Sequence, residues 1–254
     1  MSKVISIVSQ KGGVGKTTST INLAASLTKR GKRVLIIDID PQGNATTGIG
    51  IDRSSLDLSV YDLLVNKADS KNVVRQTKIK NLDILPTKID LAGADIELVN
   101  ATRRESILKN AIVELKNKYN YVLIDCPPSL GLLTLNALTA SDSVIIPVQC
   151  EYYALEGLTQ LLATIMRVQK SINKNLEIEG VLLTMLDMRT NLGMEVVEEV
   201  KVYFKDKVFK SIIPRAVRIS EAPAYGLPIT EYDISSKGAR AYLSLAKEVI
   251  DNNG

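Results

Sequence analysis

The sequence contains no histidine and no tryptophan, and aromatic residues make up only 4% of the chain. Histidine is the side chain that most often carries acid–base catalysis near neutral pH and that binds zinc. Aromatic rings are the platforms on which readers of RNA and single-stranded DNA stack bases. The composition therefore argues against a histidine-dependent hydrolase, a zinc enzyme and a base-stacking reader of single strands.

Cysteines and long apolar runs are also scarce. The chain has two cysteines, Cys126 and Cys150, and low thiol usage is typical of a reducing compartment. No apolar run approaches the ~20 residues that a membrane-spanning helix needs. The first residues lead almost directly into an apolar strand, which differs from a secretory signal. We therefore expect a cytoplasmic protein that does not bind membranes and whose thiols are inert.

What is present is a regular succession of strand and helix patterns over 254 residues with 45% apolar content. Short connections between alternating elements favour a single α/β domain over residues 1–254: a doubly wound, mostly parallel sheet flanked by helices. The expected strands cover residues 4–8, 33–37, 82–86, 121–125, 143–148, 179–186 and 210–215. The expected helices cover residues 18–30, 60–64, 103–119, 130–140, 151–172, 191–205 and 235–250. The net charge of +4 permits nucleic-acid binding without requiring it.

The first strand and first helix are joined by a glycine-rich loop, Lys11-Gly12-Gly13-Val14-Gly15-Lys16-Thr17-Thr18. Glycines let the backbone wrap phosphates and aim its N–H groups inward, and the helix adds its positive N-terminal end. Lys16 is expected to reach the β- and γ-phosphates, and the Thr17 hydroxyl is expected to bind Mg²⁺. The context of strand, loop and helix predicts a phosphate-loop nucleotide site.

One position departs from the usual phosphate-loop pattern. Gln10 stands where the first glycine is expected, and Lys11 enters the loop directly after it. Two lysines in one phosphate loop repel each other unless a strong anion separates them. Lys11 lies at the loop entrance, poorly placed to fold back onto its own phosphates. We therefore expect it to reach a nucleotide held by a second copy of the chain.

Aspartates follow two of the expected buried strands. Asp38 and Asp40 end the strand at 33–37, and Asp125 ends the strand at 121–125. The carboxyl ends of parallel strands face the ligand crevice, so these carboxylates are expected beside the phosphate loop. We expect Asp40 to orient the attacking water, Asp38 to support Mg²⁺ through water, and Asp125 to hold Mg²⁺ in the Walker B manner.

The loop resembles the deviant Walker A signature of the ParA/MinD family of ATPases, in which the first lysine acts across a dimer interface. The resemblance covers nearly the whole chain, and within the family the chain is similar to the chromosomal ParA branch, usually called Soj. It is carried further by D-x-D-P-Q-G-N from Asp38, D-C-P-P-S-L-G-L-L from Asp125, P-V-Q-C-E-Y-Y-A-L-E-G from Pro147 and S-E-A-P from Ser220.

The resemblance implies an activity and a set of partners. Relatives of this type hydrolyse ATP with Mg²⁺, form a homodimer with ATP, and bind double-stranded DNA without sequence preference. A ParB/Spo0J-type protein stimulates their hydrolysis, and they associate with the nucleoid. The catalytic set would be Lys11, Lys16 and Asp40, and the metal set Thr17, Asp38 and Asp125. Adenine would lie near Thr184, Met185, Pro214 and Arg215.

DNA binding is implied for two arginines, Arg189 and Arg218, which match basic residues that the family uses on phosphates. Guanidinium groups suit this task because they pair bidentately with phosphate oxygens. Four lysines could extend the patch, but acidic residues lie among them, which equally fits a mixed solvated face. These lysines are Lys201, Lys205, Lys207 and Lys210.

Two alternative functions remain open at this stage. A membrane-cycling ATPase like MinD would need a C-terminal amphipathic helix rich in basic and bulky apolar residues, whereas the tail after Tyr242 has one lysine offset by acids. A metallocluster carrier, like the related nitrogenase iron protein, would share an iron–sulfur cluster between thiolates of two subunits. The motifs favour the partitioning ATPase over both.

Overall fold

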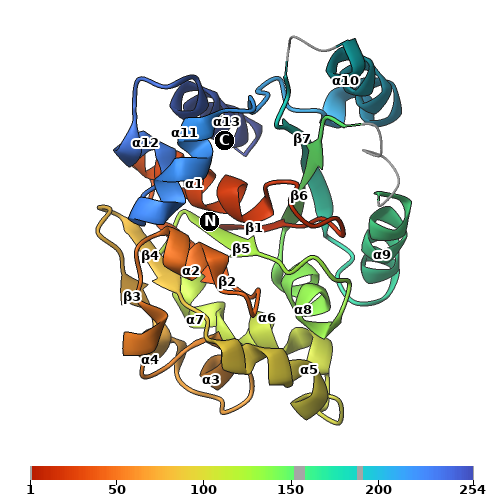
Figure 1. Cartoon of the computed structure of the whole chain (residues 1–254). Helices are drawn as coiled ribbons and strands as arrows, with labels where there is room; N and C mark the ends of the chain where they lie inside the picture. The colour runs from red at the N-terminus through yellow and green to blue at the C-terminus, as the bar shows by residue number, and fades with distance from the viewer. Residues whose placement is uncertain (1, 152–157, 188–190, 254) are drawn as a thin grey trace.

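Seven strands form one sheet in the order β3-β4-β2-β5-β1-β6-β7 (Figure 1). The computed structural model describes residues 2–151, 158–187 and 191–253. Within these residues the strand pairs are parallel, apart from the antiparallel pairing of β3 with β4. The strands are β1 (Lys3–Ile7), β2 (Val34–Asp38), β3 (Arg75–Gln76), β4 (Leu82–Leu85), β5 (Tyr121–Asp125), β6 (Ser143–Gln149) and β7 (Glu177–Thr184).

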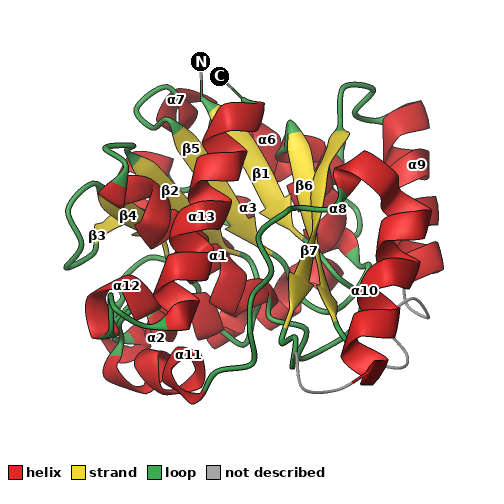
Figure 2. Ribbon diagram, turned by 90° about the horizontal axis from the view of Figure 1, so that it is seen from above, coloured by secondary structure: helices red, strands yellow, loops and turns green. Residues whose placement is uncertain are grey.

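Helices cover both faces of the sheet, as expected for a doubly wound fold (Figures 1 and 2). The α-helices are α1 (Lys16–Lys29), α2 (Asn44–Gly48), α3 (Val60–Leu64), α4 (Ser70–Val73), α5 (Ala94–Glu97), α6 (Ile107–Ala111), α7 (Val113–Lys116), α8 (Leu132–Ala140), α9 (Leu158–Ser171), α10 (Asn191–Phe204), α11 (Val217–Glu221), α12 (Ile229–Tyr232) and α13 (Lys237–Asn252). Short 3₁₀ helices are η1 (Arg53–Ser55), η2 (Ile89–Gly93), η3 (Arg104–Ser106), η4 (Lys205–Lys207) and η5 (Ala222–Tyr225).

The alternating side chains of the strands divide the core into two layers. In β1, Ile5 and Ile7 face the layer that includes α1 and α13, whereas Val4 faces the layer that includes α8, α9 and α10. The central strands β2 and β5 are buried at every position, because helices cover both of their faces. This burial explains why these strands read as continuous apolar runs in the sequence.

The C-terminal helix α13 packs its apolar face against the domain. Tyr242, Leu245, Ala246 and Val249 are almost fully buried in the layer shared with α1. Ser236 caps the helix, its hydroxyl accepting a hydrogen bond from the Ala239 N–H. The apolar face that a membrane-binding helix would need is therefore occupied by the core. No helix in the described part of the chain is long and apolar enough to span a bilayer.

Several sequence predictions differ from the structure. The stretch 210–215 is not a strand but a strap beside β7 with isolated bridges, Val181–Val208 and Leu186–Pro214. The ladder is interrupted because the N–H groups of Lys210 and Ser211 donate to the Glu248 carboxylate of α13 instead.

The predicted helix 103–119 is divided into η3, α6 and α7, since Ile112 leaves the helical conformation between α6 and α7. The short antiparallel strand β3 was not predicted, because two residues carry no periodic signal. The start of the helix predicted at 151–172 lies partly outside the described residues, and α9 covers its remainder.

Candidate nucleotide site

The glycine-rich loop adopts the backbone that its glycines allow. Gly13 and Gly15 have φ angles of 76° and 90°, in the left-handed region that other residues rarely occupy. Gly15 is the N-cap of α1, so the loop leads into the positive end of a 14-residue helix. The predicted sequence of strand, loop and helix is present, and α1 begins two residues earlier than the apolar pattern indicated, at Lys16.

Lys16 lies inside the loop rather than in solvent, with only 7% of the residue exposed. Its Nζ donates to the backbone carbonyl of Lys11 at 3.2 Å. Burial lowers the pKa of the Lys16 ammonium, and the nearby Asp125 carboxylate opposes that shift. A phosphate group brought into the loop would meet a desolvated cation, where charge–charge attraction is stronger than in water.

Asp125 connects the end of β5 to the first turn of α1. Its carboxylate accepts hydrogen bonds from the Thr17 hydroxyl at 2.8 Å and from the Thr20 hydroxyl at 3.1 Å. Burial raises the pKa of this carboxylate above its usual range, and the charge of Asp38 adds to the shift. A hydroxyl beside a carboxylate is the set of hard oxygen donors that Mg²⁺ prefers. Thr17 and Asp125 therefore fit a divalent cation.

Asp38 is the register partner of Asp125 on the neighbouring strand β2. Its carboxylate accepts hydrogen bonds from the Thr46 N–H at 2.8 Å, the Thr46 hydroxyl at 2.6 Å and the Asp40 N–H at 3.2 Å. The pKa of Asp38 is raised, chiefly by burial. Its oxygens are thus engaged within the protein, so its predicted support of Mg²⁺ would be indirect.

A cavity of about 280 Å³ lies between the glycine-rich loop and the two aspartate loops. We call it the phosphate cavity. Asp40 lines it, and one of its carboxylate oxygens also accepts the Gln42 N–H at 3.0 Å. Sequence reasoning placed Asp40 here but missed Pro128. The cavity is lined by Gly12, Gly13, Gly15, Lys16, Thr17, Thr18, Asp40, Gln42, Asn44, Pro128 and Met185.

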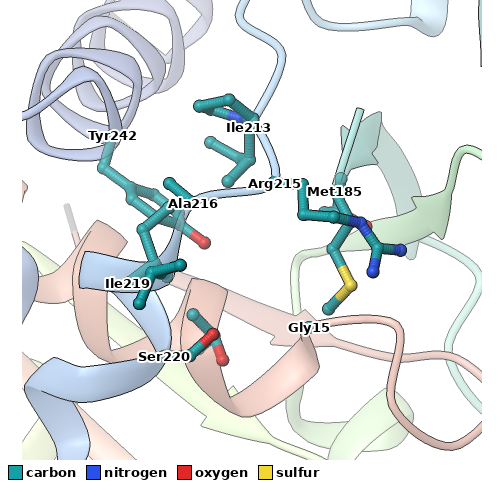
Figure 3. A pocket seen from close by; sticks show the side chains of 12 residues that line it. Gly15, Met185, Ile213, Arg215, Ala216, Ile219, Ser220 and Tyr242 are labelled. Carbon is teal, nitrogen blue, oxygen red and sulfur yellow. The ribbon is translucent and has the colours of Figure 1, made fainter. Parts of the chain in front are cut away.

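A second, more apolar cavity of about 330 Å³ adjoins the first, and we call it the base cavity (Figure 3). Tyr242 and Ile219 lie on one side of it in the view, and Met185 and Arg215 on the other. The two cavities share Gly15, Thr18 and Met185. The base cavity is lined by Gly15, Thr18, Thr184, Met185, Ile213, Pro214, Arg215, Ala216, Val217, Ile219, Ser220 and Tyr242.

Two contacts join the base cavity to the rest of the site. The Thr184 hydroxyl, at the end of β7, donates to the Val14 carbonyl of the glycine-rich loop at 2.8 Å. The Arg215 guanidinium donates to the Glu151 carboxylate at 2.7 Å. Met185 has a φ of 55°, a conformation that side chains other than glycine rarely adopt. The resemblance indicated four of these residues, whereas Ile219, Ser220 and Tyr242 carry no local signal in the sequence.

Lys11 lies apart from the phosphate cavity. It lines a separate small pocket together with Pro147, Gln149 and Leu158, and it does not line the phosphate cavity. Its backbone carbonyl accepts the hydrogen bond from Lys16 Nζ. The other seven residues of the glycine-rich loop, from Gly12 to Thr18, include six that line the phosphate cavity. The position of Lys11 at the loop entrance is as the sequence predicted.

The predicted DNA-binding residues are only partly described. Arg189 lies outside the described residues. Arg218, on α11, has an exposed side chain, but its guanidinium approaches the Glu221 carboxylate at 3.3 Å and the Asp233 carboxylate at 3.9 Å. It also lies 5.8 Å from the centre of the Tyr232 ring. Phosphate oxygens would have to compete with these two carboxylates for Arg218.

The four lysines predicted near this surface are exposed. Lys201 forms an ion pair with Glu198 at 2.9 Å, on the same turn of α10. That pairing fits the mixed solvated face that the sequence equally allowed. The other three are Lys205, Lys207 and Lys210.

Both thiols are buried, with Cys126 wholly inaccessible and Cys150 6% exposed. Burial raises the pKa of both, that of Cys150 to about 11. A cluster shared between two subunits needs thiolates that a partner can reach. The burial and the raised pKa values of these thiols are the opposite of that requirement, so the iron–sulfur alternative has no support in the described residues.

A family model described as an AAA domain matches residues 2–178. The chain is 62% identical over 252 residues to the sporulation initiation inhibitor protein Soj of Bacillus subtilis (strain 168), covering 99% of this chain and 100% of that protein. It is 54% identical over 254 residues to the chromosome-partitioning ATPase Soj of Treponema pallidum (strain Nichols), covering 100% and 99%.

A similar solved structure is that of cobyrinic acid a,c-diamide synthase from Mycobacterium smegmatis with bound ADP and magnesium. It is 39% identical, covers 97% of this chain and 93% of that one, and superposes with a TM-score of 0.86. The predicted doubly wound phosphate-loop fold and the resemblance to ParA and Soj are thus confirmed. This chain belongs to the AAA-domain family of P-loop ATPases that includes the Soj chromosome-partitioning proteins.

Proposed function

We propose that this chain is an ATP-driven partitioning switch. ATP and Mg²⁺ bind in the phosphate and base cavities, two copies then close face to face, and the closed pair binds duplex DNA without sequence preference. Hydrolysis separates the copies and releases the DNA, a switch driven by the γ-phosphate. Within a cell, such a protein would associate with the nucleoid.

The observation that carries the proposal is the position of Lys11. Its side chain does not line the phosphate cavity of its own chain, although it belongs to the same loop as Lys16. A cation at the rim of an anion site contributes most when a second copy brings it over the neighbouring triphosphate. Nucleotide binding and dimerisation would then be linked, because each nucleotide neutralises a lysine of the opposite chain.

The chain supplies binding and positioning more than acid–base chemistry. Thr17 and Asp125 would hold Mg²⁺, which when bound neutralises charge on the phosphates. Lys16 would bind the phosphate oxygens, and Asp40, which also lines the cavity, would orient the attacking water. No arginine is among the described residues that line the phosphate cavity. Unstimulated hydrolysis is therefore expected to be slow.

Slow hydrolysis leaves room for a stimulating partner, and a ParB-type DNA-binding protein suits that role. DNA binding by a pair would exceed that by one copy, since two joined patches act with a high effective concentration. We assign Arg189 and Arg218 to this patch. Arg218 offers an exposed guanidinium, although it must exchange its carboxylate partners Glu221 and Asp233 for phosphate oxygens.

Sedimentation velocity with and without ATP, and with duplex DNA, tests the proposal. Asp40→Ala should bind ATP, sediment as a dimer and stay bound to DNA, because it keeps the phosphate loop but loses the orienting carboxylate. Lys11→Ala should bind ATP and remain monomeric. A nucleotide-loaded Asp40→Ala chain that stays monomeric would contradict the dimer, and unchanged dimerisation of Lys11→Ala would remove Lys11 from it.

Arg218→Glu separates DNA binding from dimerisation. The variant should form the ATP-dependent dimer but lose the salt-sensitive gel shift with duplex DNA, because phosphate contacts dominate such binding. Arg240→Glu, an exposed arginine on α13, is the matched control for a change of two charge units. Equal DNA binding by the two variants would take Arg218 out of the patch.

A further inference from the structure

Arg53 makes an unusual set of contacts beside the loop that follows β2. It is the first residue of η1, and its guanidinium donates three hydrogen bonds to backbone carbonyl groups. Nη1 reaches the carbonyl of Gln42 at 2.6 Å, Nη2 that of Pro41 at 3.0 Å, and Nε that of Thr87 at 3.2 Å. The first two carbonyls belong to the residues directly after Asp40.

The partners of Arg53 are carbonyl groups, and none of the ion pairs found among the described residues includes it. Arg218, by contrast, approaches two carboxylates on the surface. A planar guanidinium presents its donors in a fixed fork, so three carbonyls held by one fork are fixed relative to one another. Arg53 thus joins the loop after β2 to the connection after β4.

Gly43 gives the guanidinium room to lie against the loop. Its φ is 67°, and a Cβ built on it would lie 2.5 Å from Cζ of Arg53. Any side chain at this position would displace the guanidinium or the loop. The glycine of the D-x-D-P-Q-G-N segment therefore serves this contact as well as the turn.

The same connection is tied to Asp38 from the other side. The Thr87 N–H donates to the Thr46 hydroxyl at 3.0 Å, and that hydroxyl donates to Asp38 at 2.6 Å. The Asp40 N–H donates to Asp38 at 3.2 Å. Together with the contacts of Arg53, these hydrogen bonds form a closed ring around the loop. Arg53 is the member of the ring that contacts the residues immediately after Asp40.

We propose that Arg53 is a positioning residue for ATP hydrolysis, which holds residues 41–43 so that the Asp40 carboxylate stays directed at the phosphate cavity. The inference rests on the proposed role of Asp40 in hydrolysis. Arg53 does not line the phosphate cavity, so it acts through the loop. Without its three hydrogen bonds, Pro41 and Gln42 can turn, and the Asp40 carboxylate loses its fixed orientation.

Nucleotide affinity should be almost independent of Arg53. The phosphates would be held by the glycine-rich loop and Lys16, and the base cavity is built from the end of β7, residues 213–216, α11 and α13. None of these elements contacts the guanidinium in the hydrogen bonds described. A loss of hydrolysis at unchanged affinity is therefore the signature that separates positioning from general destabilisation.

The test compares Arg53→Ala and Arg53→Lys with Arg75→Ala. Arg75 is the matched control, because its guanidinium also donates to backbone carbonyls, those of Asn72 and Val74, but on the edge strand β3, which β4 separates from β2. Single-turnover hydrolysis of labelled ATP by excess protein measures the rate, and calorimetry with ADP and Mg²⁺ measures affinity.

Arg53→Ala should slow hydrolysis by roughly 10- to 100-fold, the scale expected for a misplaced catalytic group, at unchanged ADP affinity. Arg53→Lys should recover part of the rate, because an ammonium can reach one carbonyl but not hold the fork. Arg75→Ala should match the parent chain. Wild-type hydrolysis by Arg53→Ala, or an equal loss in Arg75→Ala, would overturn the inference.

Hydrogen exchange of the apo protein gives a readout that does not depend on activity. Peptides covering 38–48 should exchange faster in Arg53→Ala than in the parent or in Arg75→Ala, and unchanged exchange there would also overturn the inference. Asp40→Ala is assayed in parallel. If Asp40→Ala hydrolyses ATP at the parental rate, the proposed role of Asp40 fails; if it is inactive while Arg53→Ala is not, only the inference about Arg53 fails.

Discussion

The phosphate cavity and the base cavity share Gly15, Thr18 and Met185, yet they take the rest of their walls from different parts of the chain. Most of the phosphate cavity comes from one short loop and two strand ends, and it presents polar groups at fixed positions. The base cavity is assembled from the end of β7, residues 213–216, α11 and α13, and its walls are more apolar. The polar phosphate cavity is thus formed mainly by residues close together in the sequence, whereas the apolar base cavity is formed by segments that are distant in the sequence.

This difference predicts unequal responses to substitution. Polar contacts to an anion are strong and specific, so removing one from the phosphate cavity should abolish most binding. Contacts in the base cavity are numerous and individually weak, so single substitutions there should lower nucleotide affinity only modestly. Substitutions of Lys16 and Thr184 test this ranking of affinities, and a substitution of Tyr242 tests how one wall of the base cavity contributes to stability.

Lys16→Ala should weaken binding of ATP with Mg²⁺ by about 2–5 kcal/mol, the usual result of removing one partner of a buried charge pair. Lys16 is 7% exposed, and it is the only cationic residue among the described residues that line the phosphate cavity. Isothermal titration calorimetry measures the loss. Lys29→Ala is the control, since that lysine lies at the far end of the same helix in an ion pair with Glu231. Full retention of affinity by Lys16→Ala would contradict the expectation that polar contacts in the phosphate cavity dominate nucleotide binding.

Thr184→Val tests the contact that joins the two cavities. It removes the hydroxyl that donates to the Val14 carbonyl while keeping the size of the side chain. The buried carbonyl is left without that donor, which should lower the free energy of unfolding by about 1–3 kcal/mol. ADP affinity should fall less than in Lys16→Ala.

Urea unfolding with and without ADP measures both effects of Thr184→Val. Thr164→Val is the control, because that hydroxyl donates to a carbonyl on an exposed helix turn. An ADP affinity lost as completely as in Lys16→Ala would show that the two cavities do not respond as separate units.

The smallest effect concerns Tyr242 in the base cavity. Burial raises the pKa of its phenol, so above its ordinary value of about 10 the unfolded chain releases a proton that the folded chain keeps. The unfolded state then binds fewer protons, and the free energy of unfolding falls as pH rises. Tyr242→Phe should reduce this fall in urea unfolding measured between neutral and alkaline pH.

At neutral pH, Tyr242→Phe should change stability little, because it removes one long hydrogen bond of 3.3 Å to the Ser19 hydroxyl. Tyr225→Phe is the control, since Tyr225 is 67% exposed and its phenol is not buried. The same pH dependence in the Tyr242→Phe and Tyr225→Phe proteins would refute the assignment of the alkaline loss to Tyr242.

The accuracy of sequence prediction follows the same division between local and dispersed structure. The glycine-rich loop, the strands β2 and β5 and their terminal aspartates were predicted within one or two residues, because buried parallel strands and a loop of glycines leave continuous local patterns. The helices predicted at 60–64 and 235–250 begin within two residues of the observed starts of α3 and α13, because a serine caps each of them.

The predictions were wrong or silent where a distant partner decides the outcome. The stretch 210–215 has the composition of a strand, but the Glu248 carboxylate of α13 takes two of its N–H groups. Tyr242 reads as an ordinary member of a helical apolar face, and only the packing of α13 brings it to the base cavity. Arg53 reads as a surface arginine, and its three carbonyl partners become neighbours only when β2 and β4 pair.

The amino-acid sequence alone determined the phosphate-binding loop, the carboxylates opposite it and the class of fold, because each depends on residues close together in the chain and on backbone conformations that only glycine adopts freely. The tertiary structure decided the shape of the base cavity and the three hydrogen bonds from Arg53 to backbone carbonyl groups. Those features depend on contacts between segments distant in the sequence, and hydrogen bonds of that kind are satisfied only once the sheet and its helices have packed.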